Sequence, residues 1–163
     1  MLYLPHDPLT LAEITAVWHI FLAAIFGAAL GLERSVAGKH AGMRTYALVS
    51  MGSALFVSTG VLASYTLAVF PAVNPTLIAS SVVVGIGFIG AGLAAFRNEP
   101  VEITTAAGIW VAAAIGLAEG FGLSIIGCVS TFIAMLIFRA LMPLEARIRT
   151  LFSAESPASE DRK

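Results

Sequence analysis

The sequence predicts an all-α membrane protein, a bundle of five transmembrane helices with its N-terminus outside and its C-terminus in the cytoplasm. The chain of 163 residues is 58% hydrophobic and only 12% charged, and its mean hydropathy is +0.92. Average proteins contain about 25% charged residues. This chain therefore has more apolar surface than one soluble core of its length can hide. Five apolar runs, separated by short loops, supply the candidate helices.

The lengths of the apolar runs define the expected spans. A hydrocarbon core about 30 Å thick requires roughly 17–25 helical residues. The expected spans are 14–32, 46–70, 77–96, 103–118 and 121–142, preceded by an extracytoplasmic segment, 1–13, and followed by a tail, 143–163. The fourth run is short, so it is either a slightly sunken span or a re-entrant segment. The polar tail is expected to be disordered at its end.

The distribution of Lys and Arg predicts the topology. The first 32 residues contain neither, which argues against a signal peptide and for a retained first span. Cytoplasmic loops concentrate cationic residues. With five spans all nine fall on one side: Arg34, Lys39, Arg44, Arg97, Arg139, Arg147, Arg149, Arg162 and Lys163. A fourth run that turned back would place the last five outside, so the pattern favours five crossings.

Small residues recur at helical spacing in the first, third and fourth runs. The stretch GIGFIGAG (85–92) matches the G-x-G-x-x-G pattern of dinucleotide-binding loops, but it lies inside an apolar run without the required strand, soluble helix and acidic residue. In lipid, small residues instead allow helix backbones to approach closely. We therefore expect these three runs to form the tight centre of the bundle, and the alternative is that their close packing lines a narrow polar path. The expected packing positions are Gly27, Gly31, Gly85, Gly87, Gly90, Gly92, Gly108, Gly116 and Gly120.

Glu33 is the main candidate for a functional polar residue because it ends the first apolar run. An ionisable group at the hydrocarbon is costly and indicates a function and a partner. Neighbouring positions on a helix do not face each other, so Arg44 and Lys39 are predicted to pair with Glu33 in preference to Arg34. The alternative is that Glu33 and Arg34 simply mark the water interface.

Two further polar segments are candidates for binding. In the loop 37–45, glycines permit a tight turn that presents Lys39, Arg44 and Thr45, which suits an anion or a lipid headgroup. The same cations also fit an ordinary positive-inside anchor. Thr104 and Thr105 open the fourth run, where hydroxyls commonly cap a helix. The functional alternative is that they bind a hard cation such as Mg²⁺ together with Glu33.

Other side chains gave weaker indications. Trp110 lies well inside the fourth run and is expected to pack against other helices, whereas Glu119 at its outer turn is expected to be exposed to water. His19 has no partner at metal-ligand spacing. The sequence shows no nucleophile and base pair, no H-E-x-x-H helix and no phosphate loop. We therefore expect neither an enzyme nor a cofactor, apart from a Mg²⁺ interaction, and no nucleic-acid partner.

Residues 27–56, GAALGLERSVAGKHAGMRTYALVSMGSALF, resemble the signature of the MgtC/SapB family of membrane proteins. The stretches GIGFIGAG and TTAAGIWVAAAIGLAEGFG (104–122) are similar to the second and third blocks of that family, and the match covers roughly residues 14–142. The resemblance implies a multi-pass protein of the bacterial inner membrane that is associated with magnesium limitation. It also implies a regulatory role through another membrane protein, the ATP synthase in some members. Direct magnesium transport is not established for the family.

The resemblance implies, position by position, which residues here correspond to the motif residues of the family. They are Gly27, Gly31, Glu33, Arg34, Lys39, Gly42, Arg44, Thr45, Gly87, Gly90, Gly92, Thr105 and Trp110. Many members continue into a soluble C-terminal domain, whereas this chain stops about 20 residues after the last span, as expected for a short form. Glu119 replaces the usual small residue.

Three functional hypotheses follow. The leading one is a non-enzymatic protein of magnesium or ion homeostasis that acts through contacts with another membrane protein or as a homo-oligomer in the bilayer. The alternative is a small oligomeric Mg²⁺ transporter or channel with Glu33, Thr104 and Thr105 as ligands. A third is a lipid-sensing scaffold that uses the cationic loop.

Overall fold

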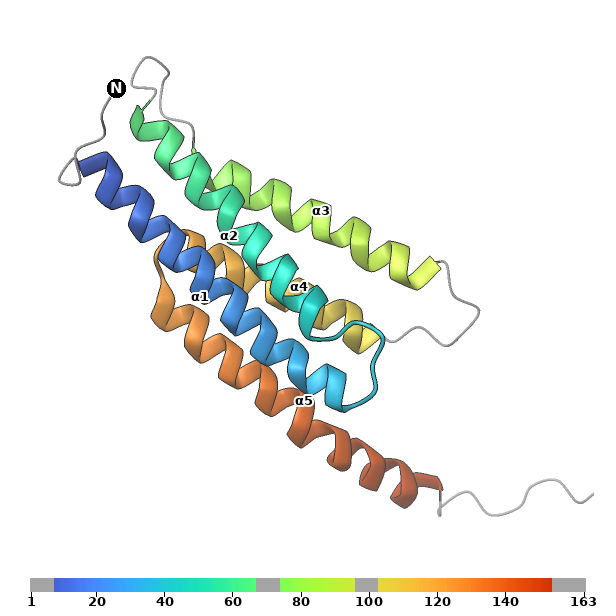
Figure 1. The fold of residues 1–163 in the computed structure, drawn as a ribbon. Coiled ribbons are helices and arrows are strands. Elements are labelled where there is room, and N and C mark those ends of the chain that lie inside the picture. Colours follow the sequence, from blue (N-terminus) through green and yellow to red (C-terminus); the bar gives the residue numbers. More distant parts are fainter. Residues whose placement is uncertain (1–7, 67–73, 96–102, 154–163) are drawn as a thin grey trace, which may run out of the picture.

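The computed structural model describes residues 8–66, 74–95 and 103–153, and all regular structure in these ranges is α-helical (Figure 1). The helices are α1 (Pro8–Val36), α2 (Met43–Thr66), α3 (Pro75–Ala95), α4 (Ile103–Gly120) and α5 (Ser124–Ser153). The predicted loop 97–102 and the end of the tail, 154–163, lie outside the described residues. Helix α1 begins within the segment expected to precede the first span. Helix α5 continues to Ser153 through Pro143, past the expected end of the last span.

Four of the helices have the length and composition of membrane spans over their described residues. Four described segments are long and apolar enough to cross a bilayer, and α3 contributes a shorter apolar segment: Pro8–Val36, Met43–Ser64, Ile103–Gly120, Ser124–Leu141 and, in α3, Thr76–Gly92. The fourth run is one unbroken helix of 18 residues, which at 1.5 Å per residue is about 27 Å long. It does not turn back as a re-entrant segment would. The fold is therefore the predicted all-α membrane bundle.

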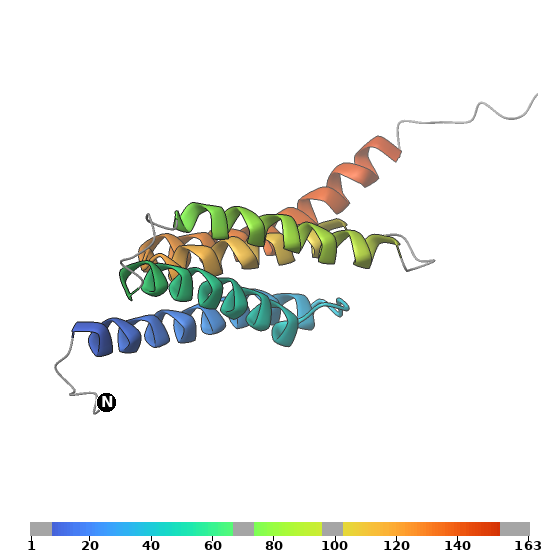
Figure 2. The ribbon, with the colours of Figure 1, turned by 90° about the horizontal axis from the view of Figure 1, so that it is seen from above.

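Helix α4 is the centre of the bundle, because it contacts each of the other four helices. Helix α3 contacts α2 and α4 and lies at one edge, whereas α5 contacts α1 and α4 and lies on the other side (Figures 1 and 2). The prediction that the first, third and fourth runs form the tight centre is wrong for α3. Helix α2 takes that place, since its Ser50, Ser53 and Ala54 are buried and small side chains permit close approach as glycine does.

A glycine turn ends α1 and determines where the following helix begins. Gly38 has a φ of +70°, and its N–H donates to the carbonyl oxygen of Ser35 at 3.1 Å. The N–H of Lys39 donates to the carbonyl oxygen of Arg34 at 2.9 Å. These two bonds form a Schellman motif, which requires a left-handed residue such as glycine. The turn leaves Arg34 in the last turn of α1.

The same motif ends α4. Gly122 has a φ of +76°, and its N–H donates to the carbonyl oxygen of Glu119 at 2.8 Å. The N–H of Leu123 donates to the carbonyl oxygen of Ala118 at 2.9 Å, and α5 then begins at Ser124. Because this reversal is short, Ser124 lies directly beside the end of α4.

Candidate functional site

The site at the end of the bundle that carries the α1–α2 loop is built around Arg34. This side chain is only 4% exposed, and its Nε donates to Oε2 of Glu33 at 2.5 Å. Its guanidinium also lies over the ring of Phe138 on α5, with Cζ 3.9 Å from the ring centroid. A buried cation requires a counterion, and the aromatic face adds a cation–π contact. Arg34 therefore joins α1 to α5 inside the bundle.

The predicted pairing of Glu33 with Arg44 or Lys39 is wrong in this structure. The carboxylate of Glu33 is 11% exposed and is bonded to Arg34, whereas Arg44 is exposed on the loop side of α2. The prediction used the rule that adjacent helical residues face apart. Arg34 stands in the last turn of α1 with a long side chain that turns inward, and the adjacent carboxylate is its counterion.

Tyr46 of α2 is the second member of this site. It is fully buried, and its hydroxyl donates to the carbonyl oxygen of Thr105 on α4 at 3.2 Å. Gly108 makes the space: a Cβ there would lie 2.7 Å from Cζ of Phe138 and closer still to the hydroxyl of Tyr46. The structure thus brings residues of four helices together in what we call the inner cluster: Glu33, Arg34, Tyr46, Thr105 and Phe138.

The glycines of α1 lie against α2, as expected for packing positions. A Cβ on Gly27 would lie 2.5 Å from the carbonyl oxygen of Tyr46, and one on Gly31 would lie 2.7 Å from Cα of Met43. Such distances are shorter than those of real Cβ contacts, and the neighbouring backbone atoms cannot easily move aside. These two glycines therefore allow α1 and α2 to touch along their backbones.

The glycines of α4 also lie against α2. A Cβ on Gly116 would overlap the carbonyl oxygen of Ser50 and would lie 2.9 Å from its Cα. A Cβ on Gly120 would lie 2.8 Å from the carbonyl oxygen of Ala54. The four-residue ladder expected on this run therefore forms the tight contact between α2 and α4.

The glycines of α3 do not have the expected packing role within the chain. Apart from the adjacent backbone of α3 itself, no atom lies within 4 Å of where a Cβ on Gly85, Gly87 or Gly92 would be. A Cβ on Gly90 would make only an ordinary contact, 3.8 Å from Cβ of Ala106. The spacing of small residues identifies a helix face but not the helix that covers it. Among the described residues, no helix covers this face of α3.

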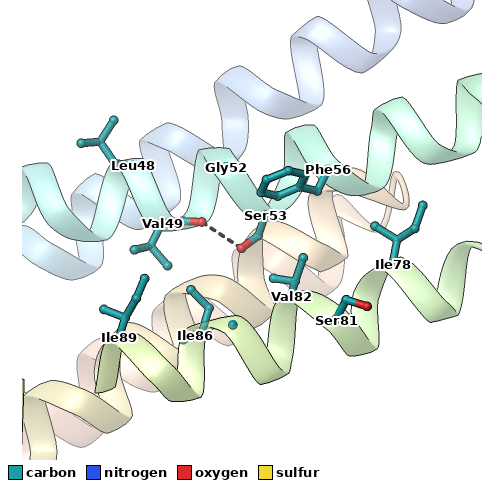
Figure 3. A pocket seen from close by; sticks show the side chains of 11 residues that line it. Leu48, Val49, Gly52, Ser53, Phe56, Ile78, Ser81, Val82, Ile86 and Ile89 are labelled. Carbon is teal, nitrogen blue, oxygen red and sulfur yellow. Dashed lines mark hydrogen bonds between the residues drawn. The ribbon is translucent and has the colours of Figure 1, made fainter. Parts of the chain in front are cut away.

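An apolar groove lies between α2 and α3 beside this uncovered face (Figure 3). Its volume is about 520 Å³, and we call it the α2–α3 groove. The hydroxyls of Ser53 and Ser81, which line it, donate to the carbonyl oxygens of Val49 and Leu77 in their own helices. The groove therefore presents an apolar surface to its surroundings. Its lining residues are Leu48, Val49, Gly52, Ser53, Phe56, Ile78, Ser81, Val82, Gly85, Ile86 and Ile89.

The predicted cationic loop forms a separate cavity of about 360 Å³, which we call the loop pocket. Met43, the first residue of α2, donates its N–H to Oγ of Ser35 at 2.9 Å. The N-terminus of α2 therefore lies at the loop pocket, and the positive end of its helix dipole adds to the positive charge of the cationic side chains. Such an environment suits a phosphate or another anion. The lining residues are Ser35, Lys39, His40, Gly42, Met43, Arg44 and Thr45.

Two of the three candidate Mg²⁺ ligands, Glu33 and Thr105, belong to the inner cluster, and Thr104 does not. The carboxylate of Glu33 is bonded to Arg34, Thr105 is buried, and Thr104 is exposed. Within the ranges that the structure describes, no three His, Cys, Asp or Glu side chains form a group that could hold a metal ion. The structure thus divides the predicted polar set between the inner cluster, the loop pocket and the exposed start of α4.

Two expectations for α4 are wrong. Glu119 is fully buried, whereas it was expected to be exposed to water, and its Oε2 lies 3.1 Å from Nδ1 of His19. Trp110 is half exposed on the outside of the bundle and does not pack inside it. His19 was expected to have no partner at metal spacing, and its partner is this distant carboxylate. The glycine turn after Glu119 was the available signal, because it allows α5 to return directly against the end of α4.

The comparisons with known proteins agree on one family. The model of the MgtC family matches residues 20–147. A protein named "Putative magnesium transporter YhiD" from Escherichia coli (strain K12) is 46% identical over 128 residues, which are 75% of this chain and 60% of that protein. Protein SrpB of Synechococcus elongatus is 39% identical over 130 residues, 73% of this chain and 70% of that protein. Protein MgtC of Brucella abortus is 36% identical over 123 residues, 75% of this chain and 49% of that protein.

The matched region covers about 60% of YhiD, so the similarity concerns only part of that relative. No solved structure matches the chain.

Proposed function

Because the chain belongs to the MgtC family, we propose that it is a multi-pass protein of the bacterial inner membrane that acts in magnesium homeostasis or in adaptation to magnesium limitation. It acts non-enzymatically, by binding a transmembrane helix of another membrane protein. The name of the similar YhiD protein supports the link to magnesium. The cytoplasmic side is the end with the α1–α2 loop, where Arg34, Lys39 and Arg44 lie.

The observation that carries this proposal is the uncovered face of α3. Gly85, Phe88 and Gly92 are three and four residues apart and share one side of the helix. The two glycines have open space around them, and Phe88 is 82% exposed. The α2–α3 groove continues this surface. In lipid, a face with small residues beside a groove is the kind of surface against which another helix packs closely.

The state of the polar groups in the inner cluster also supports binding over ion conduction. The charge of Arg34 is neutralised by Glu33, and the hydroxyl of Tyr46 is bonded to the carbonyl oxygen of Thr105. A cation pathway requires oxygen ligands that can replace the water around the ion. These oxygens are instead engaged within the protein: the carboxylate of Glu33 neutralises Arg34 on the same helix, and the carbonyl oxygen of Thr105 binds α4 to α2.

The proposal is tested by growth in low magnesium after the α3 face is blocked. In Gly85→Leu/Gly92→Leu the new side chains project into open space, so we expect the protein to accumulate in the membrane at the normal level. We also expect the cells to lose growth in low magnesium and the partner protein to be absent after co-purification. The matched control is Ala140→Leu on the exposed side of α5. Growth of the double variant equal to that of the wild type would contradict the proposal.

The same protein also tests the transporter alternative. The purified chain is reconstituted alone into vesicles, and magnesium uptake is followed with an internal indicator. We expect no uptake above that of empty vesicles. Uptake above that of empty vesicles would support the transporter and would overturn the binding proposal. Capture of only a second copy of the chain from native membranes would also contradict it.

A further inference from the structure

A second polar cluster lies at the end of the bundle that carries the α4–α5 turn, opposite the end with the α1–α2 loop. Glu119 of α4 is fully buried, and its Oε2 lies 3.1 Å from Nδ1 of His19 on α1. The hydroxyl of Ser124 on α5 donates to the same oxygen at 2.8 Å and lies 3.2 Å from that Nδ1. Three helices therefore meet around one carboxylate, which we call the outer cluster: His19, Glu119 and Ser124.

The fold makes room for this carboxylate. A Cβ on Gly127 of α5 would overlap Oε1 of Glu119 and would lie 3.3 Å from its carboxyl carbon. Gly122, the left-handed residue of the turn, faces the imidazole, and a Cβ there would lie 3.7 Å from Nε2 of His19. Gly127 thus leaves space for the carboxyl group of Glu119, and Gly122 lies against the imidazole ring of His19. This arrangement is a second buried polar site, separate from the inner cluster.

The hydrogen bonds of the acid are unequal. Oε2 has two neighbours with a hydrogen to share, whereas Oε1 is buried and has no hydrogen-bond partner among the described residues. A carboxylate with one bare oxygen in an apolar site is costly to keep ionised without a compensating positive charge. A carboxylate beside a neutral imidazole carries one negative charge. One added proton therefore makes the cluster electrically neutral.

In the part of the chain that the structure describes, no charge other than that of His19 lies where it could neutralise Glu119. Among the described residues, His19 on α1 is the one titratable side chain at ion-pair distance. Helix α2 approaches the end of α4 with Ala54, Val57 and the hydroxyl of Ser58, which donates to the carbonyl oxygen of Gly120 at 3.4 Å. Helix α5 contributes Ser124 and a glycine, and Glu13 on α1 is exposed.

We propose that His19 and Glu119 form a proton-binding site, in which one proton taken up from water is held between the imidazole and the carboxylate. The side chain of His19 is 20% exposed and that of Glu119 is not exposed at all. His19 is therefore the entry point and Glu119 the buried acceptor. The hydroxyl of Ser124 positions Oε2 for the transfer. The site does not depend on magnesium or on the face of α3.

The transfer is balanced in protons and charge. A proton from water binds at Nε2 of an imidazole that already carries a hydrogen on Nδ1, and an imidazolium results. The Nδ1 hydrogen then moves to Oε2 across the 3.1 Å contact. The products are an imidazole protonated at Nε2 and a neutral carboxylic acid, so the cluster has lost its negative charge. Release to water reverses both steps.

The test is pH-difference infrared spectroscopy of the full chain in lipid nanodiscs, from about pH 4 to about pH 9, the range in which free carboxyl and imidazole groups titrate. We expect Glu119 to contribute a carboxylic acid band that appears together with a change in the ring modes of His19, beside the signals of the other acids and histidines of the chain. In Glu119→Gln this band is lost, whereas it is retained in the matched control Glu13→Gln, where the acid is exposed. An unchanged band in Glu119→Gln would overturn the proposal.

Two further variants keep the test decisive if Glu119→Gln does not fold. Ser124→Ala retains the acid but removes a donor to Oε2, so we expect the acid band to shift in frequency. His19→Gln removes the entry point, and we expect the coupled ring signal to vanish and the remaining acid band to change its pH dependence. An acid band at the same frequency and with the same pH dependence in both variants would show that no proton is shared.

Discussion

The guanidinium of Arg34 lies over the ring of Phe138, with its Cζ 3.9 Å from the ring centroid, and thereby ties the end of α1 to α5. The same guanidinium is bonded to Glu33, the preceding residue. Because the cation is almost completely buried, its two partners act together: the carboxylate neutralises the charge, and the aromatic ring fills the space above it. This relationship makes Glu33 a structural counterion of Arg34.

Removal of that counterion is expected to destabilise the bundle. Breaking a buried ion pair costs about 3–5 kcal/mol, and we expect the lower part of this range for Glu33→Gln, because the Glu33 side chain is 11% exposed. The measurement is the melting temperature of the purified chain in detergent. The double variant Glu33→Gln/Arg34→Met removes the charge as well, so we expect it to recover much of the loss. A double variant less stable than Glu33→Gln would contradict this account of Arg34.

The different surroundings of Gly116 on α4 and Gly87 on α3 predict opposite effects on stability when each is replaced by alanine. In Gly116→Ala the new Cβ overlaps backbone atoms of Ser50, so the helices must move apart, at a cost of about 1–3 kcal/mol. In Gly87→Ala the Cβ enters open space, and the higher helix propensity of alanine stabilises α3 by up to about 1 kcal/mol. Thermal unfolding of the two variants checks the contrast, and equal losses would mean that α3 is covered as tightly as α4.

These two glycines also show how far the sequence determines the fold. Hydropathy and run length predicted the five helices, and four-residue spacing placed Gly108, Gly116 and Gly120 on a packed face. The same reasoning failed for Gly87, because spacing identifies a small face without naming its partner. That partner was expected inside the chain, whereas α2 covers α4 with small residues that are mostly serine and alanine.

The polar contacts were harder to predict, since each depends on how a helix ends. Arg34 reaches its neighbour Glu33 because it stands in the last turn before Gly38, where the helix rule for adjacent residues is least informative. Glu119 is buried because the turn at Gly122 brings α5 back over it. Pairs such as His19 and Glu119 join helices far apart in the sequence, and no local pattern predicts them.

The hydroxyl of Tyr46 is expected to make a modest contribution that is separable from the aromatic ring. Tyr46→Phe removes the bond to the carbonyl oxygen of Thr105 and keeps the packing beside Gly108. A buried hydrogen bond contributes about 0.5–1.5 kcal/mol, so we expect a small drop in melting temperature. A larger loss in Tyr46→Leu would separate the two contributions. An unchanged melting temperature in Tyr46→Phe would mean that this bond adds nothing to stability.

The loop pocket is expected to bind anionic lipid headgroups. Each Lys or Arg near an anionic surface contributes about 1 kcal/mol, so phosphatidylglycerol should raise the melting temperature of the wild type more than phosphatidylcholine does. We expect Lys39→Gln/Arg44→Gln to lose most of that difference. Arg139→Gln, which removes an exposed cation outside the pocket, is the control. An equal loss in the control would indicate general charge attraction.

The central claim is that the chain acts by binding another membrane protein through the uncovered face of α3. Site-specific photo-crosslinking in native membranes under magnesium limitation tests it most directly. The crosslinker replaces Phe88 on α3 or, as a control, Ile125 on α5, because both side chains are 82% exposed. The account predicts a discrete adduct with a different membrane protein from position 88 and none from position 125. Equal labelling from both positions, or no protein adduct from position 88, would contradict it.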